Sequence, residues 1–344
     1  MPWDVRQAPH VITWEVTRAC QLHCRHCRAK AIRHRNPAEL TLAEIEQVLE
    51  DIRDHFDPHP LLIFTGGDPT ERDDLLDILR ASVQRGLSTA VAPSVTPNLT
   101  PAVLDAWREV GVRTISLSID GPSPAVHDTF RGVPGTFLAS LAVARAIKER
   151  GFGLQVNTAV DVHTVDSLPE MGALARDLGV ASWEVFFVVP TGRARQEDAL
   201  SPESMDRTLA WLATYAQSAP YRVTAVAAPQ YRRVMLETIP GLARPRTPAV
   251  REAQGFAFID HTGEVYPSGY LPVSGGNVRR TPLSTIYRES PLFVSLRDPD
   301  ALKGKCGTCP YRDICGGSRA RAYAVHGDVL AEDPGCPYSA VMAV

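Results

Sequence analysis

The sequence contains no hydrophobic run long enough to cross a membrane and no excess of basic residues. Its longest dense apolar stretch, VFFVV at residues 185–189, is far shorter than the roughly 20 residues that a membrane-spanning helix needs. The 36 lysines and arginines face 39 acidic residues, for a net charge of −3, so we expect neither nucleic-acid nor membrane binding. The N-terminal residues MPWDVRQAPH lack the apolar core of a signal peptide, so the expected location is the cytoplasm.

Cysteine is also absent from most of the chain, since residues 28–305 contain none. The seven cysteines form a triplet near the N-terminus and a group of four near the C-terminus: Cys20, Cys24 and Cys27, then Cys306, Cys309, Cys315 and Cys336. In a reducing cytoplasm, cysteines grouped in this way indicate metal ligands or catalytic thiols rather than disulfides.

The triplet has the spacing C-x3-C-x2-C and directly follows a predicted strand. Three thiolates can hold three irons of a cubane iron–sulfur cluster and leave the fourth iron open for another ligand. The alternatives are three unrelated cysteines, or zinc with a further ligand from His23 or His26. The C-terminal group, C-x2-C-x5-C-x20-C, offers four ligands, which suits either a structural zinc or a fully ligated 4Fe–4S cluster.

Apolar periodicity predicts six rounds of strand and helix. The strands are expected at 11–17, 61–64, 88–93, 113–120, 153–160 and 181–190, and the helices at 40–52, 73–86, 100–111, 136–151, 167–179 and 201–217. This alternation predicts an α/β fold with parallel strands wrapped by helices, either a barrel or a doubly wound sheet. The cysteine triplet and other polar segments follow strand ends, where such folds build their active sites.

The alternation stops after residue 218, which predicts a domain of residues 1–218 and a second of 219–344. The second begins with a strand at 221–230, a short helix at 232–239 and a linker rich in Pro and Arg. A hairpin follows over 256–269, turning at 261–263. The cysteine-rich end has little periodic apolar content, so a bound metal is expected to stabilise it.

In this order, the strand, the cysteine triplet and a Gly-Gly-acid segment after the next strand resemble the radical S-adenosylmethionine (SAM) superfamily, over about residues 11–200. The resemblance implies a partial (β/α)6 TIM-like barrel and a 4Fe–4S cluster held by Cys20, Cys24 and Cys27 as the catalytic ligands. In that family the open iron binds SAM, whose reductive cleavage gives a 5′-deoxyadenosyl radical that abstracts a hydrogen atom from the substrate. An external electron donor such as flavodoxin or ferredoxin is then also implied.

The same resemblance implies which residues bind SAM. Thr65, Gly66, Gly67 and Asp68 match the segment that binds the methionine amino group, with Asp in place of the more usual Glu. His26 occupies the place of a residue that packs near the adenine.

Further SAM-binding residues are implied in and after the segment SLSIDGP. Ser118 would lie near the SAM carboxylate and Asp120 on the ribose side. Asn157, on the fifth strand, is another candidate. Arg131 would pair with the SAM carboxylate, or else cap a surface loop.

The C-terminal cysteine group resembles a SPASM/Twitch extension, which carries auxiliary clusters. Ser268 stands where a cysteine of a first auxiliary cluster would be expected, so we expect one auxiliary 4Fe–4S cluster. The stretch CGGSRARAYAVHGDVLAEDPGC is most similar to the subgroup that modifies tetrapyrroles. Arg319 and Arg321 would then meet substrate carboxylates, or else pair with Asp313 or Glu332 to hold the tail together.

The predicted function is therefore oxidative tailoring of a carboxylate side chain on a haem-pathway tetrapyrrole. One alternative is modification of a ribosomally made peptide, which is the common substrate type of SPASM enzymes. Another, of a different class, is a non-catalytic metal-cluster scaffold. The SAM-binding segments argue against a scaffold, which has no need of them.

Overall fold

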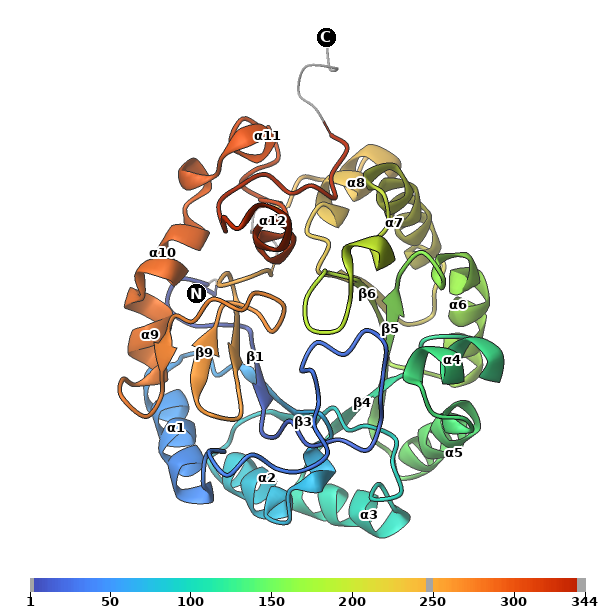
Figure 1. The fold of residues 1–344 in the computed structure, drawn as a ribbon, viewed down its shortest axis with the longest axis vertical. Helices are drawn as coiled ribbons and strands as arrows, with labels where there is room; N and C mark the ends of the chain where they lie inside the picture. The colour runs from blue at the N-terminus through green and yellow to red at the C-terminus, as the bar shows by residue number, and fades with distance from the viewer. Residues whose placement is uncertain (1–2, 246–249, 339–344) are drawn as a thin grey trace.

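The computed structural model describes residues 3–245 and 250–338 and contains a single sheet of ten strands within those ranges (Figure 1). The strand order is β10-β9-β8-β1-β2-β3-β4-β5-β6-β7. The strands are β1 (Val11–Glu15), β2 (Leu61–Thr65), β3 (Thr89–Val91), β4 (Thr114–Ser118), β5 (Gly153–Val160), β6 (Ser182–Phe187), β7 (Arg222–Val226), β8 (Phe256–Ile259), β9 (Glu264–Tyr266) and β10 (Gly276–Asn277).

Strands β1 to β7 pair in parallel in chain order, and β8 adds a parallel strand on the other side of β1. Figure 1 shows this sheet curving inside a ring of helices, as in a partial TIM barrel. The predicted α/β class and all six predicted strands are confirmed. The chain also has a seventh parallel strand, β7, followed by helix α8, and an eighth parallel strand, β8.

The helices are α1 (Leu42–His55), α2 (Leu75–Gln84), α3 (Pro101–Val110), α4 (Pro124–Arg131), α5 (Thr136–Glu149), α6 (Leu168–Asp177), α7 (Pro202–Ala216), α8 (Tyr231–Thr238), α9 (Leu283–Glu289), α10 (Pro291–Arg297), α11 (Gly304–Gly307) and α12 (Arg319–His326). Thr41 caps α1 as its sequence predicts, since its hydroxyl accepts from the Glu44 N–H at 3.3 Å. Helices α4, α9, α10, α11 and α12 were not predicted from the sequence. Among the described helices, none combines the length and apolar character that crossing a membrane requires.

Alternation along the strands separates the hydrophobic core from the barrel interior. In β4, Ile115 and Leu117 are fully buried in the core, while Ser116 and Ser118 line an internal cavity. In a strand, successive side chains point to opposite faces, so one strand can supply both packing and site residues.

The C-terminal segment is joined to the barrel. The hairpin of β8 and β9 turns at residues 260–263, as predicted, and β8 pairs with β1. The sheet therefore continues across residue 218. The division into domains 1–218 and 219–344 stays a prediction, and residues 246–249 of the expected linker lie outside the described residues.

Candidate active site

A cavity of about 230 Å³ opens at the carboxyl ends of the parallel strands. It brings together eleven of the residues that the sequence predicts for the cluster and for SAM: Cys20, Cys24, His26, Cys27, Thr65, Gly66, Gly67, Ser118, Asp120, Arg131 and Asn157. They come from the loop after β1, the ends of β2 and β4, the middle of β5 and the end of α4, so separate elements build one site.

The loop that carries the triplet is fixed by its own backbone. Its two limbs pair, because Cys20 N–H donates to the Ile32 carbonyl at 2.9 Å and Ile32 N–H donates to the Arg18 carbonyl at 3.0 Å. Arg193, which follows β6, donates to the Cys24 carbonyl at 3.1 Å. The cysteine loop is therefore held by hydrogen bonds within residues 18–32 and by Arg193 from the segment after β6.

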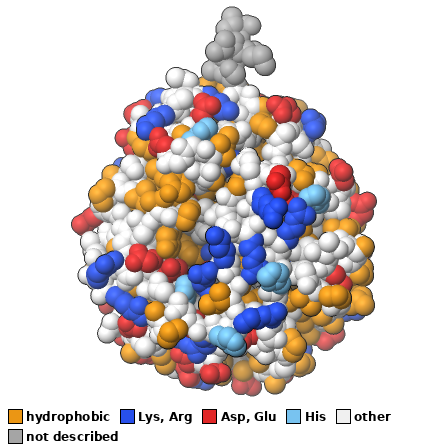
Figure 2. All heavy atoms as spheres, in the orientation of Figure 1, with side chains coloured by type: hydrophobic (Ala, Val, Ile, Leu, Met, Phe, Trp, Pro, Cys, Tyr) orange, Lys and Arg blue, Asp and Glu red, His pale blue; other side chains and the backbone are white. Residues whose placement is uncertain are grey.

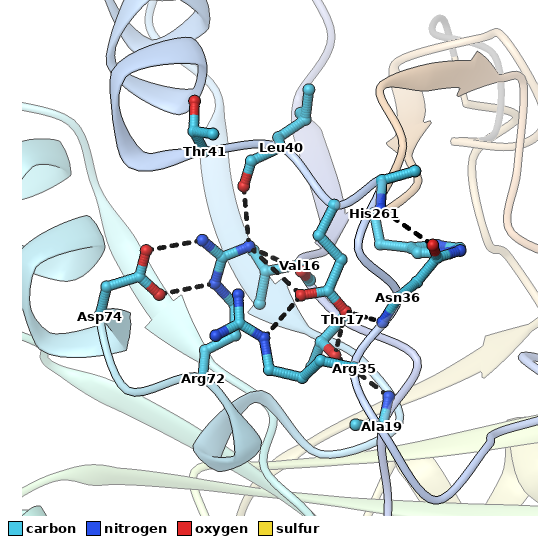
Figure 3. Close-up of polar contacts among 12 residues, drawn as sticks. Val16, Thr17, Ala19, Arg35, Asn36, Leu40, Thr41, Arg72, Asp74 and His261 are labelled. Carbon is cyan, nitrogen blue, oxygen red and sulfur yellow. Dashed lines mark hydrogen bonds and ion pairs between the residues drawn. The ribbon is translucent and has the colours of Figure 1, made fainter.

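A buried charge network closes the base of this loop (Figure 3). The Glu39 carboxylate accepts from the Thr17 hydroxyl at 2.5 Å and from Arg35 Nε at 2.8 Å, and so joins the two ends of the loop. Arg72 lies 3.8 Å from the same carboxylate, forms a two-point pair with Asp74 and donates to two backbone carbonyls. Such buried charges are tolerable only because each is paired and hydrogen-bonded.

The donor set fits an iron–sulfur cluster. Cys20 and Cys24 are buried, Cys27 is half-buried, and each is a free thiol. Backbone N–H groups of Leu22 and Ala31 point at Cys20 Sγ and Cys27 Sγ, at 3.3 and 3.4 Å. Burial raises the pKa of Cys20 to about 11 and also raises the pKa of Cys24, so a bound metal would have to displace their protons.

The two glycines after β2 are required by close packing against the cysteine loop. A Cβ on Gly66 would lie 2.5 Å from the Thr17 carbonyl oxygen, and one on Gly67 would lie 2.5 Å from the Ala19 oxygen. Asp68 N–H donates to that same Ala19 oxygen at 2.7 Å. The sequence interpretation ascribed these glycines to the approach of a ligand, and the structure adds that they let two backbones touch.

The Asp68 carboxylate points away from the cavity, unlike its predicted neighbours. It is fully buried, and its two oxygens accept from Thr70 N–H at 3.1 Å and from the Thr96 hydroxyl at 2.7 Å. Burial raises its pKa. Asp68 therefore braces the loop after β2, and Thr65, Gly66 and Gly67 before it line the cavity.

Arg131 lies inside the site and does not cap a surface loop. Its Nη2 is 2.6 Å from Asp120 Oδ2, and its Nη1 is 3.7 Å from Cys24 Sγ. Asp120 also accepts from Ala159 N–H at 2.8 Å. Arg131 Nε is buried without a hydrogen-bond partner among the described residues, so a donor remains for an anionic ligand.

His26 is a neutral aromatic surface of the cavity. Its ring stacks on Phe130 at 4.1 Å between centroids. Burial lowers the pKa of His26 to about 4, so the ring is uncharged at neutral pH. His26 therefore belongs to the lining of the cavity.

Sequence reasoning missed several lining residues, among them His127, Arg28 and Tyr270. His127 Nδ1 accepts from Asp120 N–H at 3.1 Å, so this ring orients the predicted aspartate. Tyr270 follows the β8–β9 hairpin and reaches the cavity from the C-terminal segment. Only the fold could show this, because no local motif marks a tyrosine that enters the barrel from a distant hairpin.

The four C-terminal cysteines meet in a second, smaller pocket of about 20 Å³. Backbone N–H groups donate to three of their sulfurs, at 3.3 to 3.5 Å: Asp333 to Cys306, Tyr311 to Cys309 and Gly317 to Cys315. Burial raises the pKa of Cys315 to about 12. A four-sulfur set with such N–H donors fits either a fully ligated 4Fe–4S cluster or a structural zinc.

The predicted substrate role of Arg319 and Arg321 is wrong, because both side chains are buried in the tail. Arg319 donates to the Val329 and Ala331 carbonyls and lies 3.7 Å from Cys306 Sγ. Arg321 donates to the Ala227 carbonyl. They hold the tail together, as the alternative interpretation proposed, but through backbone oxygens and an Arg321–Asp333 ion pair at 3.5 Å rather than through Asp313 or Glu332.

Residues 14–177 match the Radical SAM superfamily. An AdoMet-dependent heme synthase of Methanosarcina barkeri (strain Fusaro) is 37% identical over 96% of this chain and 97% of its own length. This chain belongs to the radical SAM superfamily. It is therefore an enzyme of a class that uses a 4Fe–4S cluster and SAM.

A second relative agrees with this membership, and solved structures have a similar fold. The AdoMet-dependent heme synthase of Oleidesulfovibrio alaskensis (strain G20) is 39% identical over 97% of this radical SAM chain and 89% of that protein. Streptococcus suis SuiB bound to S-adenosylmethionine has a TM-score of 0.75 at 15% identity, over 98% of this chain and 78% of SuiB. AnSMEcpe with bound AdoMet has a TM-score of 0.72 at 16% identity, over 95% and 94%. These structures share the fold of this chain.

Proposed function

We propose that this chain oxidatively tailors a carboxylate side chain of a haem-pathway tetrapyrrole in a SAM-dependent reaction. The observation that carries the reaction type is the convergence of three free thiols, two glycines and the Asp120–Arg131 pair on one cavity. The tetrapyrrole substrate is supported by near full-length identity of 37–39% to two AdoMet-dependent heme synthases.

In this proposal, Cys20, Cys24 and Cys27 hold the cluster that binds SAM. When bound, the cluster and SAM supply a 5′-deoxyadenosyl radical that takes a hydrogen atom from the substrate. The barrel wall excludes water from this chemistry, because the core side chains behind it are almost fully buried.

The remaining cavity residues bind and orient SAM. The backbone of Gly66 and Gly67 receives its methionine end, and Arg131 supplies positive charge and an unpaired N–H beside Cys24. Asp120 and Asn157 offer polar atoms for the ribose side. Asn157 Oδ1 already accepts from Gln155, so its amide N–H groups remain for a ligand.

The C-terminal group is proposed to hold one auxiliary 4Fe–4S cluster. Four ligands leave no open iron, so this cluster would relay electrons or stabilise the tail rather than bind the substrate. Flavodoxin or ferredoxin in the cytoplasm is the proposed external donor, since the first cluster must be reduced for SAM cleavage.

A peptide substrate is the second candidate. Its support is a PqqA peptide cyclase of Ruegeria pomeroyi, 30% identical over 96% of this chain, and the fold shared with SuiB bound to precursor peptide SuiA. The heme synthases are more similar to this chain in sequence, which favours the tetrapyrrole.

The test is anaerobic turnover of the reconstituted, dithionite-reduced enzyme with SAM. Incubation with a carboxylated iron porphyrin such as Fe-coproporphyrin III, the compound in another relative's name, should give a lighter tetrapyrrole product by mass spectrometry. Cys24→Ala should form no 5′-deoxyadenosine, whereas Cys309→Ala should still form it. Absence of 5′-deoxyadenosine from the loaded wild type would refute the enzyme class. Its formation without any change in the porphyrin would leave the peptide as substrate.

A further inference from the structure

The loop that carries the cysteine triplet is unusually basic. Residues 16–38 contain six arginines and lysines and no acidic residue. The whole chain has a net charge of −3, so the rest of it carries nine more negative than positive charges (−3 − 6 = −9). Figure 2 shows Lys and Arg side chains gathered near the middle of the face where Figure 1 draws this loop. The positive charge is therefore local, and it surrounds the first cluster site.

Half of these cations already have acidic partners. Arg25, Arg28 and Arg35 pair with Asp198, Glu15 and Glu39. The other three are Arg18, Lys30 and Arg33, and no carboxylate of residues 3–245 or 250–338 lies in ion-pair range of them. Arg18 and Arg33 donate only to backbone carbonyls, at 2.9 and 2.7 Å. Their charge is available to an external partner.

These three cations lie close to an exposed hydrophobic residue, Ile32: Arg33 follows it, Lys30 is two residues before it, and the Arg18 carbonyl accepts its N–H. Ile32 is 41% exposed, and the side chains at 30, 33 and 34 along the loop are polar. An apolar centre with a charged rim is the usual composition of a protein–protein contact. We call Arg18, Lys30, Ile32 and Arg33 the Ile32 patch.

The Ile32 patch faces away from the substrate cavity. Ala29 and Ala31 line that cavity, whereas the alternate residues Lys30 and Ile32 do not. Lys30 has a left-handed backbone, with φ of 47°, which turns the chain at this point. A substrate inside the barrel would therefore not need these side chains.

The Ile32 patch is one hydrogen bond away from the backbone of a proposed cluster ligand. The Ile32 carbonyl accepts the Cys20 N–H at 2.9 Å, and the Ile32 N–H donates to the Arg18 carbonyl at 3.0 Å. One residue thus joins the exposed surface to the backbone of a proposed iron ligand.

We propose that the Ile32 patch docks a small acidic electron-carrier protein that reduces the first cluster. This inference rests on the proposed function and identifies the partner's surface. One electron leaves the reduced carrier and one enters the cluster, and no bond forms or breaks. The partner is acidic because the three free cations would attract it, and the contact is small and transient, as redox encounters are.

The experiment uses reconstituted wild type and the double variant Lys30→Glu/Arg33→Glu. Two assays measure initial 5′-deoxyadenosine formation, one with reduced flavodoxin as donor and one with dithionite. A third measures flavodoxin binding by biolayer interferometry. The matched control is Arg145→Glu/Arg207→Glu, which makes the same change of charge at exposed positions on α5 and α7.

The patch variant should lose about tenfold or more of both flavodoxin binding and the flavodoxin-driven rate at low salt. Its dithionite-driven rate and iron content should stay within about twofold of wild type, and the control variant should behave as wild type. Ile32→Ala, which changes no charge, should weaken flavodoxin binding about fivefold. Added salt should slow the flavodoxin reaction of wild type more than that of the patch variant.

Three results would overturn the inference. The first is that the patch variant binds flavodoxin as well as wild type does. The second is that its rate of 5′-deoxyadenosine formation falls equally with flavodoxin and with dithionite. The third is that the patch variant has a raised KM for the porphyrin when dithionite is the donor. Failure of wild type to bind flavodoxin would also overturn it. Failure of wild type to cleave SAM with dithionite while it still binds flavodoxin would instead refute the proposed function alone.

Discussion

Replacing Arg131 with methionine removes the cation from a buried ion pair at the centre of the site. The Arg131 side chain is 12% exposed and that of Asp120 is 1% exposed, with 2.6 Å between the charged atoms. Without Arg131, Asp120 would keep one hydrogen bond, from Ala159 N–H, and no counter-charge within bonding distance. Removing one partner of a buried pair usually costs about 3–5 kcal/mol of unfolding free energy, and we expect a value in that range.

A double-mutant cycle isolates the pair. Asp120→Asn/Arg131→Met leaves no uncompensated charge, so it should be clearly more stable than Arg131→Met alone. The expected coupling is about 2–3 kcal/mol. Arg195→Met is the control, because the Arg195–Glu197 pair is 74% and 71% exposed. It should change stability by about 0.5 kcal/mol or less.

The cost of Arg131→Met should also depend on pH. Burial alone would raise the pKa of Asp120, but the Arg131 charge outweighs it and the pKa is lowered. In wild type, the stability that this lowered pKa contributes is fully present above the pKa of Asp120 in the unfolded chain. It is lost as the pH falls through the lower pKa of Asp120 in the folded protein. In Arg131→Met, burial dominates and the folded pKa is raised, so the variant recovers stability as pH falls toward about 4. The difference in unfolding free energy between wild type and Arg131→Met should therefore become smaller as the pH is lowered.

Urea denaturation under anaerobic, reducing conditions, followed by tryptophan fluorescence, measures these free energies. A loss of under about 1 kcal/mol for Arg131→Met, or strict additivity in the cycle, would show that the pair contributes little and refute the reasoning. If the loss of unfolding free energy caused by Arg131→Met instead grew as the pH fell, the direction assigned to the Asp120 pKa shift would be contradicted.

Three further predictions concern the metal and its loop. Anaerobic reconstitution should give about eight irons per chain by iron analysis, and a Cys20/Cys24/Cys27→Ala variant should keep half of that iron. Stoichiometric zinc together with a single cluster would contradict this prediction. Asp68→Ala should lower the free energy of unfolding, measured by urea denaturation, by about 1–2 kcal/mol, because the hydrogen bond that Asp68 accepts from Thr70 N–H is lost. A loss of SAM affinity in a fully stable variant would show instead that Asp68 contacts SAM. Cys309→Ala should keep SAM cleavage and block product formation, whereas full turnover by a folded protein without its second cluster would exclude both roles of that cluster.

The sequence predicts the barrel strands and most of the cavity because both depend on local pattern. Ser118 and Asn157 each end or interrupt an apolar strand, and the carboxyl ends of parallel strands meet at one edge. Placing the cysteine loop and the Gly-Gly segment at that edge needs only the strand order. The direction of the Asp68 side chain is different, because it depends on a hydrogen bond from Thr96, 28 residues away, and no local motif marks that threonine as its partner.

The sequence analysis expected strands after residue 218 but did not predict that they join the barrel sheet, because their partner strands are distant in the sequence. Strand β8 has four residues and is stabilised by pairing with β1, which lies about 245 positions earlier. Short apolar segments of this kind show no period that separates a barrel strand from a hairpin arm. Tyr270 reaches the cavity for the same reason, since it follows the hairpin whose first strand, β8, joins the barrel sheet.

The two arginines of the tail show how charge can be misread from sequence. In an isolated segment, Arg319 and Arg321 look like exposed cations, but in the fold both are buried and Arg319 lies 3.7 Å from the buried Cys306 thiol. Burial and the nearby Arg319 charge lower the pKa of Arg251 to about 10, so these guanidinium groups are costly to bury together. Asp333 already lies 3.5 Å from Arg321, and metal binding would convert the adjacent thiols to thiolates and add further negative charge. The arginines and the second cluster would therefore stabilise each other, which explains why a cysteine-rich tail carries buried cations that never reach the substrate cavity.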